Sequence, residues 1–177
     1  MKIYTVSEAK AFFRQAHDSI NHTRKYSGEP YWVHTESVER LYASAYEKDA
    51  AGRIACLGHD CLEDVAPLNR EYDIEVLMRV FSEEVVSLIV GLTHVYTKEA
   101  YPQFNRRIRK QAESMRLFGC NDKVKAIKIC DLIDNRRDIE LQDPKFAVTY
   151  NEEARFMFPL LRNPLSSPFD QELLDLI

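Results

Sequence analysis

Glycine and proline are scarce in this sequence, with 5 and 7 occurrences in 177 residues. That scarcity excludes a collagen-like or loop-rich chain and favours helices. Long apolar runs are also lacking: none approaches the roughly 18 residues of a transmembrane helix, and no apolar segment of a signal peptide follows the first lysine. We therefore expect neither a membrane span nor a secretory leader, and a cytoplasmic location.

An excess of positive charge is missing as well. The chain has 24 Lys and Arg against 28 Asp and Glu, a net charge of −4. Broad electrostatic binding to nucleic acid or to an anionic membrane needs the opposite sign, so we expect no stable nucleic-acid binding and no membrane association. An anionic small molecule stays compatible with this balance if its positive partners are local.

The cysteines lack any C-x-x-C spacing, which removes support for a zinc ribbon or a thioredoxin-like site. We expect reduced thiols, mostly buried, as in a cytosolic protein. The cysteines concerned are Cys56, Cys61, Cys120 and Cys130.

Apolar residues recur at intervals of three and four along most of the chain, the pattern of amphipathic helices. Thr5 and Glu8 form a capping box before the first of them. The sequence predicts an all-α, single-domain protein with a domain over residues 1–163 and an extended tail over residues 164–177 that contains a short turn near Leu173. Further helices are expected over residues 49–62, 73–81, 82–92, 103–117, 121–141 and 147–161, with another around residues 38–45.

One helix end gathers side chains that bind metals or move protons. His59 and Asp60 are followed by Glu63 and Asp64, and helical spacing places these two pairs side by side. They follow an apolar stretch, so buried partners or a metal must satisfy them. A second His-Asp pair begins at His17 and lacks the acidic residues; we interpret it, like His22 and His94, as surface.

Two other candidates come from distant parts of the chain. Asp131 lies within an apolar run and shares a helix face with Asn135; the alternative is a surface carboxylate paired to Lys128 or Asn135. His34 follows an aromatic segment and is expected to be buried, either as a core histidine or as a ligand. With His59 and Asp60, these residues make a set of two imidazoles and two carboxylates, which suits Mn²⁺, Fe²⁺ or Zn²⁺ better than Ca²⁺.

At these positions the sequence resembles the HD-domain superfamily, in particular the hydrolase domain of RelA/SpoT-type alarmone enzymes and small stand-alone alarmone hydrolases. Residues 24–34, RKYSGEPYWVH, resemble the family's R-K-S-G-E-P-Y-x-x-H stretch. Residues 57–64, LGHDCLED, resemble its L-H-D-x-x-E-D stretch, and residues 125–138, KAIKICDLIDNRRD, its I-K-L-A-D-x-x-x-N-x-R stretch. The three occur in the family's order, which makes the combined signal strong.

The resemblance implies an HD-type helical fold and a Mn²⁺-dependent hydrolase that removes the 3′-pyrophosphate of guanosine tetra- or pentaphosphate. Another divalent transition metal would also suit the donors. The implied metal ligands are His34, His59, Asp60 and Asp131, and the implied catalytic acids are Glu63 and Asp64. The implied substrate contacts are Arg24, Lys25 and Asn135, with Arg109 from a basic run over residues 106–110 that is otherwise a solvated helix face.

Some positions depart from the family pattern. Thr35 replaces a proline, Cys130 replaces an alanine, and the extra residue Tyr26 shifts the base-facing pair by one position. None of these removes a ligand. Two other functions stay open: an HD phosphohydrolase or phosphatase acting on a different nucleotide, deoxynucleotides included, and a catalytically silent HD domain that binds a nucleotide or a partner. Intact Glu63 and Asp64 argue against the silent domain.

Overall fold

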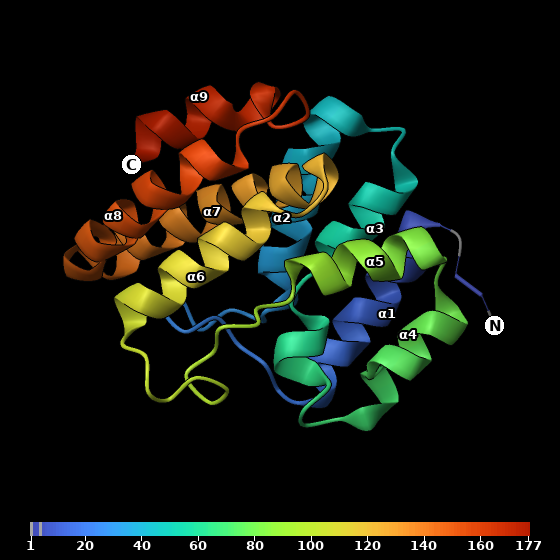
Figure 1. The fold of residues 1–177 in the computed structure, drawn as a ribbon. Coiled ribbons are helices and arrows are strands. Elements are labelled where there is room, and N and C mark those ends of the chain that lie inside the picture. The colour runs from blue at the N-terminus through green and yellow to red at the C-terminus, as the bar shows by residue number, and fades with distance from the viewer. Residues whose placement is uncertain (1, 4) are drawn as a thin grey trace. The chain divides into compact units, whose positions relative to one another are not determined.

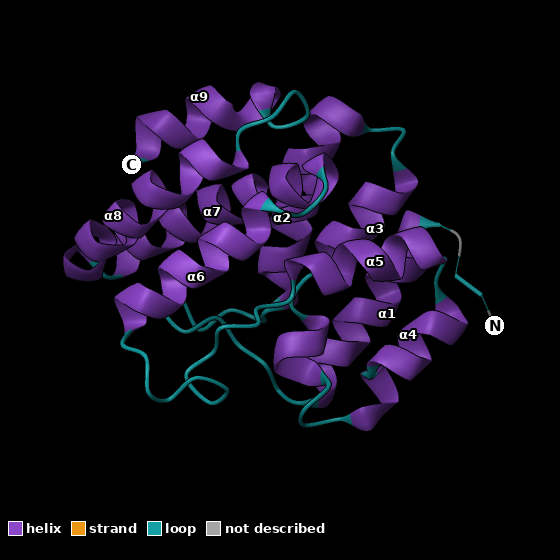
Figure 2. Ribbon diagram, viewed as in Figure 1, coloured by secondary structure: helices purple, strands orange, loops and turns teal. Residues whose placement is uncertain are grey.

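The structure is a computed structural model whose description leaves out Met1 and Tyr4. Within the described part of the chain every named element is a helix, as Figure 2 shows, and the pairing of Thr23 with Pro30 is an isolated bridge. The all-α prediction is confirmed. The chain divides into two compact units, Met1–Thr93 and His94–Ile177, called here the N-terminal and C-terminal units.

The described residues of the N-terminal unit form five α-helices and two short helices, whose arrangement Figure 1 shows. In chain order they are α1 (Val6–Ser19), α2 (Trp32–Tyr46), α3 (Ala50–Gly58), the π-helix η1 (Cys61–Val65), the 3₁₀-helix η2 (Arg70–Tyr72), α4 (Ile74–Val80) and α5 (Glu83–Leu92). The capping box before α1 is confirmed: the Thr5 side chain accepts from the backbone N–H of Glu8, and Thr5 N donates to the Glu8 carboxylate at 3.1 Å. Such reciprocal bonds satisfy N–H groups that the first turn leaves unpaired.

Helix α3 forms the centre of the N-terminal unit, where it contacts α1, α2 and α5. Its residues Ile54 and Leu57 are 3% and 1% exposed, as a helix that is apolar on most sides requires. Gly58 lets the neighbouring helices come close. A Cβ atom at this position would lie 2.3 Å from Cζ of Phe13 on α1 and 2.8 Å from Cδ1 of Ile89 on α5.

The prediction of a continuous helix over residues 49–62 is wrong. Helix α3 ends at Gly58, and η1 begins at Cys61 with wider π-type turns, including a 3.0 Å hydrogen bond from Ala66 N to Cys61 O. Gly58, the last residue of α3, lies directly before the change, but it fits the apolar spacing of the helix, and periodicity does not signal the π-turns that follow. π-turns of this kind are frequent at functional sites.

Four helices form the C-terminal unit: α6 (Arg106–Phe118), α7 (Asp122–Gln142), α8 (Pro144–Leu161) and α9 (Ser167–Leu176). Helix α7 contacts α6, α8 and α9. It begins at Asn121, whose side chain accepts from Val124 N at 2.9 Å. The helix start predicted at residue 121 is therefore confirmed, and this side-chain cap fixes the start of the helix that carries Asp131.

The expectation of an extended tail after Pro164 is wrong, because α9 occupies most of it. Phe169 and Leu173 lie four residues apart and are 2% and 0% exposed, so they form the buried side of this helix. Pro168 lies in its first turn, where the missing N–H costs nothing. The proline was therefore compatible with a helix start rather than a break.

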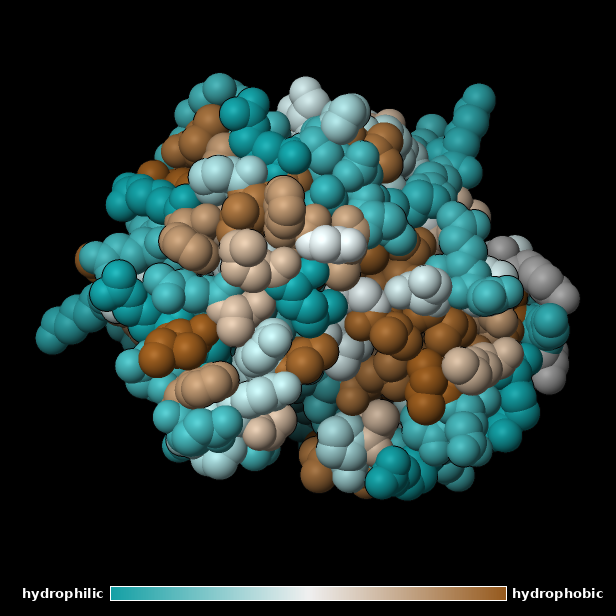
Figure 3. Space-filling model, viewed as in Figure 1, coloured by the Kyte–Doolittle hydropathy of each residue, from teal (hydrophilic) through white to brown (hydrophobic). Residues whose placement is uncertain are grey.

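Some apolar side chains of the N-terminal unit reach its surface. Figure 3 shows them gathered on the face that carries α4 and α5, where Met78 is 63% and Val90 48% exposed. Among the described residues no helix combines the length and apolarity needed to cross a bilayer. The cysteines are free thiols and all but Cys120 are buried, as predicted.

Candidate active site

His59 caps the C-terminal end of α3, and its ring is almost inaccessible at 2% exposure. Its Nδ1 lies 2.7 Å from the carbonyl oxygen of Cys56. A carbonyl oxygen only accepts, so Nδ1 carries the hydrogen and Nε2 keeps a lone pair. Histidines that bind metals are commonly oriented by a backbone carbonyl in this way.

His34 lies in the first turn of α2 and is fully buried, as its aromatic flank predicts. Its Nε2 lies 3.2 Å from Nε2 of His59. The two ring centroids are 5.1 Å apart and the ring planes meet at 70°, so the nitrogens face one another instead of the rings stacking. Two histidines separated by 25 residues thus point at one place.

A carboxylate oxygen completes this group in the N-terminal unit. Asp60 Oδ2 lies 2.9 Å from His59 Nε2 and 3.7 Å from His34 Nε2. Lone pairs on His59 Nε2 and on a carboxylate oxygen repel at this distance unless a metal cation or a proton lies between them. Imidazole nitrogens with carboxylate oxygens are the donors that Mn²⁺, Fe²⁺ and Zn²⁺ accept, so the three residues fit a divalent cation.

Glu63 and Asp64 follow on the π-helix η1 and are half-buried. Burial and, to a smaller extent, the negative charges of Asp60 and Glu63 together raise the pKa of the Asp64 carboxyl to about 8, against the opposing effect of His59. A carboxyl whose pKa lies this close to neutrality both takes up and releases protons under ordinary conditions. The acidic pair therefore suits proton transfer beside the imidazoles.

Asp131 lies on α7 of the C-terminal unit and is 3% exposed. It receives 2.6 Å hydrogen bonds from Lys128 Nζ and from Asn135 Nδ2, both on the same helix. Both pairings considered for a surface carboxylate are therefore present, but the residue is buried. Lys128 also approaches His94, with Nζ 3.4 Å from Nε2.

Comparison with protein families identifies the family of this chain. The sequence model described as "HD domain" matches residues 9–166, most of the chain. This chain belongs to the HD-domain family. The match includes both His34 and the His59-Asp60 pair, and it extends to Asp131, so the resemblance seen in the sequence is confirmed.

A curated relative of this HD domain is the guanosine-3′,5′-bis(diphosphate) 3′-pyrophosphohydrolase of Borreliella burgdorferi. The two are 37% identical over 70 residues, which is 40% of this chain. Those residues make up 10% of the relative, so the chain aligns with about a tenth of that longer protein.

A solved structure similar to this HD domain is described as "A metazoan ortholog of SpoT hydrolyzes ppGpp and plays a role in starvation responses". The TM-score is 0.77 with 20% sequence identity, and the match covers 99% of this chain and 97% of the other. At that identity the likeness establishes the fold, which confirms the HD-type helical architecture.

The base-facing residues predicted in this HD domain lie on a loop between α1 and α2. The loop is closed by the Thr23–Pro30 bridge and by a 2.8 Å hydrogen bond from Arg24 N to Glu29 O. Arg24 is buried at 8% exposure, whereas Lys25 is exposed, with Nζ 4.9 Å from the centroid of the Tyr26 ring. Their contact with a nucleobase stays a prediction.

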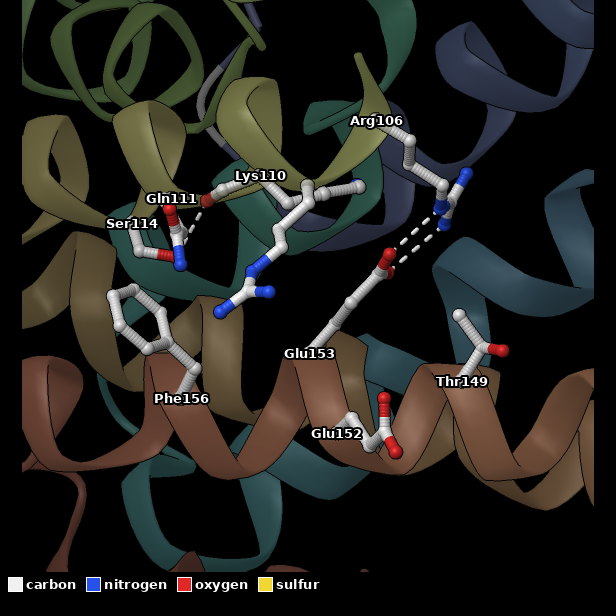
Figure 4. Close-up of a pocket in the computed structure, with 9 residues that line it drawn as sticks. Arg106, Lys110, Gln111, Ser114, Thr149, Glu152, Glu153 and Phe156 are labelled. Carbon is white, nitrogen blue, oxygen red and sulfur yellow. Dashed lines mark hydrogen bonds and ion pairs between the residues drawn. The ribbon is translucent and has the colours of Figure 1, made fainter.

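The basic run of this HD domain starts α6 in the C-terminal unit. Arg109 donates to the backbone carbonyl of Phe104, so its guanidinium is partly used inside the unit. Arg106 forms a two-bond ion pair with Glu153 of α8, at 2.6 and 2.9 Å, beside a pocket of about 490 Å³ (Figure 4). Whether Arg109 or Asn135 contacts a substrate also stays a prediction.

The interpretation of His17 as a surface residue is wrong, because it is fully buried. His17 comes four residues after Phe13 on α1, so the two side chains lie on the same, buried side of the helix. This spacing was the signal in the sequence that could have predicted its burial. Its Nδ1 lies 3.0 Å from Nδ1 of His22, which is half-buried rather than at the surface. Sequence reasoning also missed Tyr31, whose hydroxyl donates to Asp60 Oδ2 at 2.6 Å.

Proposed function

We propose that this HD domain is a metal-dependent nucleotide phosphohydrolase that converts guanosine 3′,5′-bis(diphosphate) and water into GDP and pyrophosphate. The observation that carries the proposal is the convergence of His34 Nε2, His59 Nε2 and Asp60 Oδ2 beside the acidic pair. The substrate follows from the three sequence motifs and from the activities named for the Borreliella burgdorferi protein and the metazoan protein.

Asp131 is proposed as the fourth protein ligand of the cation, as the family resemblance implies. His34, His59 and Asp60 would hold the ion with Asp131, and Mn²⁺ is the metal that the family resemblance favours. When bound, such an ion polarises phosphoryl oxygens and lowers the pKa of water. Lys128 and Asn135 would keep the Asp131 carboxylate in place through the hydrogen bonds that they donate to it.

The acidic pair would handle the protons of hydrolysis. Water adds to the phosphorus that is esterified to the 3′ oxygen, and the bond between this phosphorus and the 3′ oxygen breaks. The 3′ oxygen leaves with a proton as the 3′ hydroxyl of GDP. Glu63 would orient the attacking water, and Asp64 would accept its proton. The pKa of Asp64, raised to about 8 by burial and by neighbouring carboxylates, lies close to neutrality, which suits a group that takes up and releases protons during the reaction.

Positive and polar side chains would recognise the nucleotide. Arg24 and Lys25 would contact guanine, since a guanidinium stacks on a purine ring. Asn135 would contact the ribose or a nearby phosphate with the polar atoms that its bond to Asp131 does not use. Arg109 would add positive charge for the diphosphates.

A nucleotide panel tests the proposal. Purified protein is incubated with Mn²⁺ and, separately, guanosine tetraphosphate, GTP, dGTP and a 3′-phosphorylated nucleoside, and the products are separated by anion exchange. We expect GDP and pyrophosphate in equal amounts from guanosine tetraphosphate. Orthophosphate or tripolyphosphate from the other nucleotides, with guanosine tetraphosphate untouched, would reassign the substrate, and no turnover with any metal would remove the enzyme proposal.

Two variants separate the roles within the site. Asp60→Ala is expected to lose both bound metal and turnover, because it removes a ligand. Glu63→Gln is expected to lose turnover and keep the metal, because the residue acts on water. Metal content by inductively coupled plasma mass spectrometry, beside the turnover rate, distinguishes the two outcomes, and full activity in Asp60→Ala would contradict the ligand assignment.

A further inference from the structure

We propose that Tyr31 is a positioning residue for Asp60, and that the His17–His22 pair holds Tyr31 in the orientation this requires. The proposal rests on the cation site of the proposed function. It adds residues that lie outside that donor set, all of them in the N-terminal unit.

The first step is the bond between Tyr31 and Asp60. The tyrosine hydroxyl lies 2.6 Å from Asp60 Oδ2, the oxygen that also approaches His59 Nε2. A neutral phenol donates to a carboxylate, and this length is typical of a charge-assisted O–H···O⁻ bond. Because the Asp60 side chain is 17% exposed, the bond restrains a carboxylate that would otherwise be able to turn toward water.

The second step is the placement of Tyr31 on His22. The two rings stack with centroids 3.8 Å apart and planes at 7°, and the backbone N–H of Tyr31 donates to His22 O at 3.0 Å. The bridge between Thr23 and Pro30 closes the loop between these two residues. Ring and backbone of Tyr31 are therefore both fixed to the same histidine.

The third step is the hydrogen bond between the two histidines. The 3.0 Å separation of their Nδ1 atoms requires one donor and one acceptor, so the rings hold different tautomers. His17 Nε2 is buried and has no hydrogen-bond partner among the described residues. Since unpaired buried N–H groups are rare, His17 carries its hydrogen on Nδ1 and donates to His22.

These contacts form a continuous chain from α1 to the proposed metal ligand. His17 donates to His22, His22 stacks on Tyr31, and Tyr31 donates to Asp60. Burial lowers the pKa of both histidines, so both are neutral near pH 7 and the pair adds no positive charge beside the cation. Partners of this kind orient metal ligands, and losing one typically reduces metal affinity about 10–100-fold.

The decisive variant is Tyr31→Phe, which keeps the ring on His22 and removes only the hydroxyl. Binding of Mn²⁺ to metal-free protein is measured by electron paramagnetic resonance of the free ion. We expect the dissociation constant to rise about 10-fold or more. The matched control is Tyr42→Phe, which removes another tyrosine–aspartate bond of the same unit, 2.8 Å to Asp49. The control is expected to keep the Mn²⁺ affinity of the natural protein.

A double-variant cycle tests whether His22 acts through Tyr31. His22→Ala is expected to weaken Mn²⁺ binding when the Tyr31 hydroxyl is present and to add little in the Tyr31→Phe background. Equal weakening in both backgrounds would mean that His22 acts by another route and would overturn the chain of contacts. Should His22→Ala fail to fold, His22→Leu, which also removes the ring stacked on Tyr31 but fills more of its space, replaces it in the cycle.

The remaining outcomes are unambiguous. Unchanged Mn²⁺ affinity in Tyr31→Phe overturns the positioning role, and so does a natural protein that binds no divalent cation. A protein that binds Mn²⁺ through Asp60, loses affinity in Tyr31→Phe and hydrolyses no nucleotide in the panel would contradict the proposed function and support the positioning role.

Discussion

His59 Nε2 and Asp60 Oδ2 lie 2.9 Å apart, although the tautomer of His59 leaves a lone pair on that nitrogen. Two such acceptors at this distance need a cation or a proton between them. His59 and Asp60 are adjacent in the chain, and the backbone after α3 holds them close together. In the absence of a cation or a proton, their repulsion therefore destabilises this turn. Binding of a divalent cation relieves it.

Addition of Mn²⁺ is therefore expected to stabilise the protein. A cation that binds only the folded chain raises the free energy of unfolding by about 2.7 kcal/mol at 100 times its dissociation constant. Urea unfolding with Mn²⁺ and with a chelator measures the difference. We expect it to vanish in His59→Ala and to persist in Lys25→Ala, which changes an exposed residue outside the donor set. An equal response in both variants would contradict the ligand role of His59.

Gly58→Ala is expected to destabilise the N-terminal unit. The added Cβ would lie 2.3 Å from Phe13 Cζ, so the packing of α1 on α3 must shift. Overpacking of this kind costs about 1–3 kcal/mol, which chemical unfolding measures. Gly119→Ala is the matched control, because its nearest contact is at 3.4 Å and its backbone is helical. A loss in Gly119→Ala as large as that in Gly58→Ala would contradict the packing argument.

His17 is expected to make the protein sensitive to acid. Burial lowers its pKa from the ordinary value of 6.5 to about 3, against the attraction of Asp60. The unfolded chain therefore binds the proton first as the pH falls, and the free energy of unfolding decreases between about pH 6.5 and 3. In His17→Phe the free energy of unfolding, measured by urea unfolding at several pH values in that range, is expected to decrease less steeply as the pH falls. Parallel pH profiles for the two proteins would contradict the assignment.

Glu113→Ala is expected to destabilise the C-terminal unit. The Glu113 carboxylate is 2% exposed and accepts hydrogen bonds from Val95 N at 3.1 Å, Tyr96 N at 3.2 Å and Arg116 Nε at 2.8 Å. Removing the acceptor leaves these donors unpaired, at a cost of about 1–3 kcal/mol for a buried group. Glu152→Ala, at an exposed position of α8, is expected to stay within about 0.5 kcal/mol. Equal losses in urea unfolding would contradict this role of Glu113.

The start of the first helix and the burial of His34 were predictable because their signals are local. Thr5 with Glu8 marks a helix start, and the apolar flank of His34 marks a buried histidine, which the structure bears out. The roles of the ligands and of the catalytic and substrate-contacting residues stay predictions.

The contacts of His17 were not predictable in the same way. Its burial follows from its phase on α1, but its hydrogen bond depends on the loop that brings His22 back to it. The position of Tyr31 on Asp60 depends on a contact across 29 residues. Pairings of this kind are set by how elements pack, which the spacing of residues along one helix does not encode.

The directions of Glu63 and Asp64 depend on the number of residues in the π-helix Cys61–Val65. A π-turn contains one residue more than an α-turn. Removing a single residue from this segment would allow ordinary α-helical winding, in which successive side chains are spaced by about 100° around the axis. The side chains that remain in the segment, Glu63 and Asp64 among them, would then take new directions relative to His59 and Asp60. Deletions here are therefore expected to be far less tolerated than substitutions of neighbouring exposed residues such as Leu68.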